Sequence, residues 1–200
     1  MRRREFIAGL GGAAAWPVTV RAQQGQGTRR VGVFTALAAD EPVFKARFEV
    51  FQRELERLGW LSGRNLQLDY RFGAGQSDRY LALAQELIAS QPDAIVAHTT
   101  QVATVLHRAT QAIPIVFFDV SDPIGIGFVA SLTRPGDNMT GVLLYEAGIA
   151  GKWLAMLKEI APRLTRVAVV GNPKTTAFDY FQRATEAAAP SIQVDLVPTA

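Results

Sequence analysis

Short apolar runs alternate along residues 31–118 with longer segments in which apolar residues recur at helical spacing. The runs have the length of buried strands and cover residues 31–35, 66–72, 93–97 and 114–118. Helices are expected over residues 41–58, from a Ser77 cap to Ile88, and over residues 101–110. This order predicts an α/β fold with a doubly wound parallel sheet and right-handed crossovers. The 66–72 run alternates apolar with polar residues, so it is expected near a sheet edge.

The same alternation restarts after Gly141, where a second lobe is expected. A helix stopped by Pro162 has a predicted buried face formed by Ile149, Trp153, Met156, Leu157 and Ile160. A strand over 167–170, a helix over 177–189 with Phe178 and Phe181 facing inward, and a strand over 192–196 follow. The predicted domains are a first α/β lobe over residues 23–141 and an incomplete second α/β lobe over residues 142–200, with an exposed strand edge at 192–197.

The N-terminus has the three parts of an export signal. A basic start precedes an apolar stretch from Phe6 to Val20, and a small-residue pattern typical of a signal-peptide cleavage site follows at Val20-Arg21-Ala22. The stretch is too short and too rich in Gly and Ala for a membrane-spanning helix. The pentapeptide Arg3-Arg4-Glu5-Phe6-Ile7 resembles a twin-arginine signal. Residues 1–22 are therefore predicted to direct export to the periplasm, with a Sec signal or a plain basic N-terminus as alternatives.

The net charge of +3 comes from this N-terminus. Residues 1–22 hold four of the 21 basic and one of the 18 acidic side chains, so 17 of each sign remain in residues 23–200. Such a balance gives no indication of nucleic-acid binding. The apolar fraction of 48% supports a real core, and the absence of cysteine excludes disulfides and thiolate sites.

Polar residues gather where the predicted strands end, which is where ligands bind in open α/β sheets. The first-lobe candidates are Thr35, Thr99, Thr100, Asp119, Ser121 and Asp122. Thr99 and Thr100 lie where a helix begins, and its free N–H groups and dipole suit a carboxylate. The alternative is that one of these threonines only caps the helix.

Asp119 and Asp122 can neutralise an ammonium group, and two carboxylates can also serve as general acid and base. The alternative is turn chemistry, since Asp before Pro123 favours a turn. His98 lies at a strand end, whereas His107 is expected on a helix surface; nine residues separate them, too many for a metal pair one helical turn apart. The G-x-G-x-x-A match at 125–130 has no acidic ribose partner and predicts a tight loop. No catalytic residue, metal site or cofactor is assigned.

The chain resembles the ABC-transporter substrate-binding protein family described as tryptophan/tyrosine-type uptake proteins. Besides the twin-arginine start, the matching motifs are Glu54-Leu55, Gly59-Trp60, Gly63-Arg64-Asn65, Pro114-Ile115-Val116-Phe117 and Asn172-Pro173. The most specific block is Asp122-Pro123, Val129-Ala130-Ser131-Leu132, Arg134-Pro135-Gly136 and Asn138-Met139-Thr140-Gly141. Asp137 departs from the usual Gly; because Asp tolerates a left-handed backbone better than most residues, the turn is expected to survive at a modest cost.

The resemblance implies a periplasmic-binding-protein-like fold of two α/β lobes with a ligand cleft between them. It implies that Asn172 contacts the ligand from the second lobe. It also implies a monomer that captures a small organic solute, with an amino-acid-like carboxylate ligand the leading expectation, and delivers it to an ABC permease in the membrane. Family members are longer, so the second lobe is expected to be unfinished. The alternatives are a ligand-sensing domain for a membrane receptor and an exported enzyme of doubly wound fold.

Overall fold

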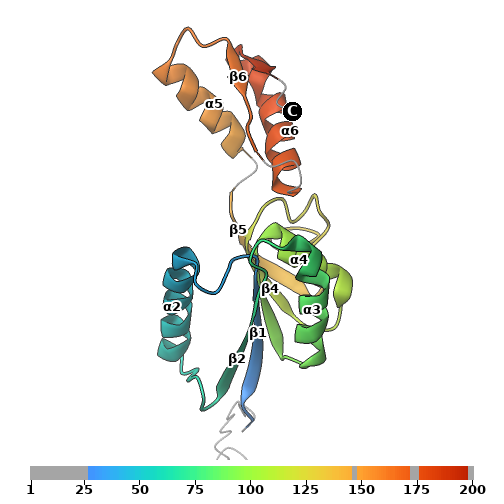
Figure 1. The fold of residues 1–200 in the computed structure, drawn as a ribbon. Helices are drawn as coiled ribbons and strands as arrows, with labels where there is room; N and C mark the ends of the chain where they lie inside the picture. Colours follow the sequence, from blue (N-terminus) through green and yellow to red (C-terminus); the bar gives the residue numbers. More distant parts are fainter. Residues whose placement is uncertain (1–26, 146–147, 172–175, 198–200) are drawn as a thin grey trace, which may run out of the picture.

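The computed structural model describes residues 27–145, 148–171 and 176–197, which form two lobes (Figure 1). The first lobe contains β1 (Arg29–Thr35), α2 (Pro42–Arg57), β2 (Leu66–Phe72), the 3-10 turn η2 (Ser77–Arg79), α3 (Tyr80–Ala89), β3 (Ala94–His98), α4 (Thr100–Ala109), β4 (Ile115–Val120) and β5 (Met139–Leu143). The second lobe contains α5 (Ile149–Ile160), β6 (Arg166–Ala168), α6 (Thr176–Ile192) and β7 (Asp195–Val197). No helix in these described ranges is long and apolar enough to cross a membrane.

The first lobe is built on a parallel five-stranded sheet in the order β2-β1-β3-β4-β5. This confirms the predicted doubly wound sheet and places β2 at an edge, as its alternating pattern indicated. The chain runs outward from β1 to β2 and then crosses to β3. The direction of winding therefore reverses between β1 and β3, which is the switch point at which such sheets bind ligands.

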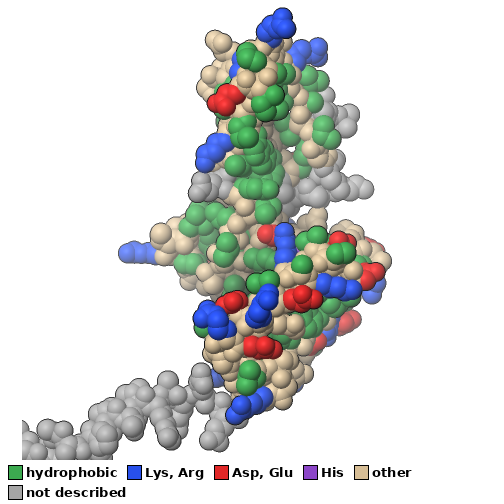
Figure 2. All heavy atoms as spheres, turned by 90° about the vertical axis from the view of Figure 1, so that its left-hand side faces the viewer, with side chains coloured by type: hydrophobic (Ala, Val, Ile, Leu, Met, Phe, Trp, Pro, Cys, Tyr) green, Lys and Arg blue, Asp and Glu red, His purple; other side chains and the backbone are tan. Residues whose placement is uncertain are grey.

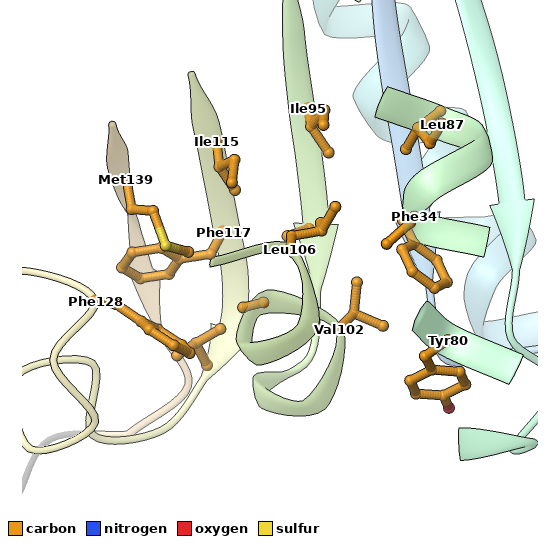
Figure 3. Close-up of a cluster of buried hydrophobic side chains, with 14 of the residues drawn as sticks. Phe34, Tyr80, Leu87, Ile95, Val102, Leu106, Ile115, Phe117, Phe128 and Met139 are labelled. Atoms are coloured by element: carbon orange, nitrogen blue, oxygen red, sulfur yellow. The ribbon is translucent and has the colours of Figure 1, made fainter. Parts of the chain in front are cut away.

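Two apolar clusters hold the helices on the sheet. Figure 3 shows the larger one, in which Phe34, Ile95 and Phe117 of the sheet face Leu87 of α3 and Leu106 of α4. On the opposite face, Phe44 and Phe48 of α2 pack on Val33. Both faces of the sheet are therefore apolar, which is why its strands appear in the sequence as nearly continuous apolar runs.

The α3 segment begins differently from the expectation. Ser77 was predicted to cap the helix, but it lies inside the 3-10 turn, and α3 itself begins at Tyr80 without a side-chain cap. Tyr80 is buried in the larger cluster, so packing of the first helical turn replaces the missing cap. The Ser77 cap prediction is therefore wrong.

Residues 121–138 join β4 to β5 without a regular helix, and Asn138 and Gly141 fix how this loop enters β5. The Asn138 amide donates to the carbonyl of Ile113 at 2.8 Å and to that of Thr110 at 3.3 Å. Gly141 lies against β4 so closely that a Cβ atom there would be 2.0 Å from the Phe117 carbonyl oxygen. The left-handed residue of the turn is Gly136, with φ +97°, so the turn does not require a left-handed backbone at Asp137.

The second lobe buries a different face of α5 from the one predicted. Ala150 and Leu154 are buried, and Leu154 packs with Ala189 and Val194. The predicted core residues Trp153, Met156, Leu157 and Ile160 are 40%, 57%, 43% and 79% exposed. Figure 2 shows hydrophobic side chains gathered on this side of the upper lobe. The prediction is wrong because the described part of this lobe has only a two-stranded sheet, β6-β7, against which a helix can pack.

The end of the second lobe also differs from the expectation. The α6 helix continues through Pro190 to Ile192, and β7 is shorter than the strand predicted from Ile192 onward. The inward packing of Phe181 is confirmed, because its ring contacts those of Tyr145 and Trp153 with centroids 5.9 and 5.4 Å apart.

Candidate functional site

The sequence-predicted polar residues of the first lobe meet at one edge of the sheet. Thr35 ends β1 and His98 ends β3, Asp119 lies within the register shift near the end of β4, and Asp122 follows the strand. The hydroxyl oxygen of Thr100 accepts a hydrogen bond from the backbone N–H of Ser121 at 3.0 Å. The end of β4 is thereby joined to the start of α4 beside the switch point.

His98 is held at this edge by a chain of polar contacts, with Thr35 and Asp119 on either side of its ring. Its Nδ1 atom lies 2.7 Å from the Thr35 hydroxyl, and its Nε2 atom lies 3.1 Å from the Asp119 carboxylate. Because a carboxylate only accepts, Nε2 holds the proton and Nδ1 accepts from Thr35. Asp119 also forms an ion pair with Arg47 of α2. Thr35, which is fully buried, and Asp119 therefore position His98 and α2.

His98 is neutral near pH 7. Desolvation lowers its pKa and the charge of Arg47 lowers it further, while the hydrogen bond and charge of Asp119 act in the opposite direction. The ring is 3% exposed and stacks on Phe118 at 4.6 Å between centroids. With both ring nitrogens occupied inside the protein, His98 is not available as a base for an external substrate.

The buried neutral His98 predicts acid sensitivity. Its folded pKa lies below the unfolded value of about 6.5, so the unfolded chain binds the proton more tightly. The free energy of unfolding has its full value above about pH 6.5 and falls below that pH. The loss is up to roughly 1.4 kcal/mol per pH unit over the range in which His98 is protonated only in the unfolded state. Urea unfolding at pH 7.5 and 5.5 measures this loss, and His98→Gln is expected to reduce it. An equal loss in the His98→Gln variant would contradict this account of His98.

Two buried hydroxyl groups at the start of α4 have no hydrogen-bond partner among the described residues: Thr99 Oγ1 and Ser121 Oγ. Ser121 is 1% exposed, and Thr99 adopts a φ of +85°, which is costly for a β-branched residue. Thr99 makes no side-chain cap bond to the helix. The Ala103 N–H donates to the Thr99 carbonyl and is the first N–H of α4 with a helical hydrogen bond. The N–H groups of residues 100–102 come before it in the chain and have no helical acceptor. Hydroxyl donors, free N–H groups and the helix dipole therefore converge here.

Asp122 begins the loop that follows β4 and has both a turn role and a free carboxylate oxygen. Its φ is +50°, and Oδ1 accepts a hydrogen bond from the Gly125 N–H at 3.0 Å. A Cβ atom at Gly125 would be 2.2 Å from Oδ2, so this position must be glycine for the carboxylate to lie where it does. The tight loop expected at 125–130 is thus present. Within the described chain, Oδ2 has no hydrogen-bond partner.

Asp122 lines a cavity of about 150 Å³ between the two lobes. Its other lining residues are Pro123, Ile124, Leu132, Leu143, Tyr145 and Tyr180. Burial raises the pKa of Tyr180, and the charge of Asp122 raises it further, so the phenol is protonated. The sequence analysis missed both tyrosines, since no pattern in the second lobe shows which residues face the first.

A larger groove of about 530 Å³ lies beside α2. Its walls are almost wholly apolar, and its only charged groups, Arg47 and Asp119, already form an ion pair with each other. Thr99 and Ser121, which have the unpartnered hydroxyl groups, do not line this groove, so its size alone does not make it the better ligand site.

Two further expectations concern single residues. Asn172 lies outside the described residues. His107 was expected on the surface of α4, but it is half-buried, and its ring packs on Phe128 at 5.3 Å between centroids. No group of three or more His, Cys, Asp or Glu residues that could hold a metal ion occurs within 27–145, 148–171 and 176–197.

Comparison with known proteins identifies the family of the chain. Residues 31–200 match the family model for ABC transporter substrate binding proteins. The chain is 30% identical over 122 residues to a protein of Clostridioides difficile (strain R20291) named tyrosine-binding protein, a match that covers 61% of this chain and 35% of the relative.

Solved structures agree with the family match. A conserved domain protein of Vibrio cholerae is 28% identical with a TM-score of 0.77, and the match covers 86% of this chain and 57% of that one. An ABC domain from Streptococcus pneumonia in complex with L-Trp is 21% identical with a TM-score of 0.76, over the same shares of each chain. The chain thus spans just over half the length of these structures, and the likeness confirms the expected periplasmic-binding-protein-like fold. The chain belongs to the ABC transporter substrate-binding protein family.

Proposed function

We propose that this protein is exported to the periplasm, where it captures an amino acid or a closely similar solute and delivers it to an ABC permease. Membership of the family and the relative named tyrosine-binding protein support the ligand class. The twin-arginine-like segment over residues 1–22 supports the route of export. We further propose that the protein acts as a monomer and performs no chemistry on its ligand.

The observation that supports ligand capture best is the pair of unpartnered hydroxyl groups at the start of α4. Buried polar groups without partners are rare in native proteins and call for a ligand, a water or an ion. Thr99 Oγ1 and Ser121 Oγ lie beside the positive end of a ten-residue helix. A carboxylate there would accept from both hydroxyls and from helix N–H groups.

We assign the ammonium group of the ligand to Asp122, whose Oδ2 atom has no hydrogen-bond partner in the described chain. An α-amino acid has its ammonium and carboxylate on one carbon, so it matches an anion site and a carboxylate on adjacent loops. We therefore propose direct contact from Thr99, Ser121 and Asp122. Thr100 joins β4 to α4 through Ser121, and we propose that Asn172 contacts the ligand from the second lobe.

Thermal unfolding of the 200-residue chain against a panel of L-amino acids, amine-free carboxylates and sugars tests the proposal. A ligand at one hundred times its dissociation constant adds about 2.7 kcal/mol, which moves the midpoint by roughly 5–10 °C for a chain of this size. We expect the shift from L-tyrosine or another neutral amino acid. A midpoint that no amino acid moves, or that sugars move equally, would contradict the proposal.

The isosteric variant Thr99→Val tests the role of the hydroxyl group alone, because both residues are β-branched and tolerate the φ of +85° equally. Loss of a hydrogen bond to a charged group is expected to weaken ligand binding by about 10- to 100-fold. The midpoint without ligand should not fall, since the hydroxyl has no partner to lose. A lower midpoint with unchanged affinity would instead indicate a structural role for Thr99.

A further inference from the structure

The cavity between the lobes contains one carboxylate and two tyrosines within otherwise apolar walls. Asp122 and the apolar Ile124 and Leu132 come from the loop after β4. Tyr145 follows β5, and Tyr180 belongs to the first half of α6. Figure 1 shows the lower end of α6 next to the loops of the first lobe. The carboxylate of the cavity thus comes from the first lobe, one tyrosine from the connection after β5, and the other tyrosine from the second lobe.

This combination of side chains suits a cation better than a neutral or anionic group. An ammonium group is attracted by a carboxylate and by the faces of aromatic rings. A neutral apolar ligand would bury the Asp122 carboxylate without a partner, which costs free energy. An anion would be repelled by it.

The two tyrosines have different surroundings. The ring of Tyr145 contacts Trp153 at 5.6 Å between centroids, and the ring of Tyr180 contacts Phe181 at 5.2 Å. Among the described residues, no hydrogen bond joins Tyr180 to Asp122, although the charge of Asp122 raises the pKa of the Tyr180 phenol. Both residues line the cavity, so the space in front of them is open to a ligand group. A cavity of about 150 Å³ has room for a group of roughly benzene size.

We propose that Asp122, Tyr145 and Tyr180 form an ammonium-recognition cavity that is shared by the two lobes. Its ligands are neutral-side-chain amino acids, and it rejects analogues that lack the amine or have a second negative charge. This inference rests on the proposed function and assigns to it the residues that select the amine. Tyr180 approaches the ligand from the second lobe and Asp122 from the first, so the ligand links the two lobes.

Calorimetric titration of the 200-residue chain with L-tyrosine and with its amine-free analogue 3-(4-hydroxyphenyl)propanoate tests this assignment. Tyr180→Leu is expected to weaken L-tyrosine binding by about 3- to 30-fold, the range of a cation–π contact. Binding of the amine-free analogue should stay within about twofold, because it makes no such contact. Tyr180→Phe keeps the aromatic face and should retain the wild-type affinity for L-tyrosine.

The outcomes separate the two proposals. Equal weakening of both ligands by Tyr180→Leu, or equal weakening of L-tyrosine by the Leu and Phe variants, would overturn amine recognition by the Tyr180 ring. Equal affinity of the wild-type chain for L-tyrosine and its amine-free analogue would overturn it as well, while ligand capture would stand. A wild-type chain that binds no amino acid would overturn the proposed function together with this inference.

Discussion

Asp122→Asn is expected to weaken binding of L-tyrosine by roughly 30-fold to several thousandfold. Loss of one partner of a buried, hydrogen-bonded charge pair costs about 2–5 kcal/mol, and each 1.4 kcal/mol is a factor of ten in affinity. Asn retains an oxygen that can accept from the Gly125 N–H, so the turn after β4 is preserved. The loss should therefore appear in calorimetric titration and not in the unfolding midpoint without ligand.

Asp119→Asn is the matched control for this prediction, because Asp119 is a second aspartate at the same edge of the sheet. Its carboxylate is already paired with Arg47 and hydrogen-bonded to His98. We expect Asp119→Asn to lower stability and to change L-tyrosine affinity much less than Asp122→Asn does. Unchanged affinity in Asp122→Asn, or a larger loss in Asp119→Asn, would contradict the assignment of the ammonium group to Asp122.

Gly141→Ala is expected to lower the free energy of unfolding by about 3 kcal/mol, at the upper end of overpacking effects. The added Cβ would be 2.0 Å from the Phe117 carbonyl oxygen, a backbone atom within the β4–β5 ladder that cannot rotate away. The midpoint should fall by roughly 6–12 °C in a chain of this length.

Gly148→Ala serves as the control for Gly141→Ala. Gly148 precedes α5 with a φ of −78°, and a Cβ atom there would meet nothing within 4 Å. Its unfolding midpoint should match that of the wild type. Equal midpoints for the two variants would show that β5 moves away from β4 at little cost, in contradiction to the packing described here.

The first lobe could be predicted from the sequence because its inner strands are apolar on both faces, its edge strand β2 alternates, and each helix has a single apolar stripe. The α5 helix shows the limit of that reasoning. Its stripe of Trp153, Met156, Leu157 and Ile160 predicts a buried face, but periodicity cannot show whether any element covers it. The turn before β5 accommodates Asp137 for a reason that the pattern did not show, since Gly136 beside it adopts the left-handed backbone at lower cost.

The site could be predicted only as far as strand ends indicate it. Thr99, Ser121 and Asp122, the proposed ligand contacts, follow strands β3 and β4, so the rule for parallel sheets predicted that they lie together. The fixation of His98 could not be predicted, because its partners Thr35 and Asp119 are 63 and 21 residues away in the chain. Tyr145 and Tyr180 were also missed, since their position depends on how the lobes face each other.

A crystal structure of the protein grown with L-tyrosine tests the central claim most directly. We predict a ligand between the lobes, with its carboxylate at Thr99 Oγ1 and Ser121 Oγ and its ammonium group at Asp122 Oδ2. A ligand bound instead in the α2 groove beside Arg47, or bound between the lobes with its ammonium group at α4, would contradict the account.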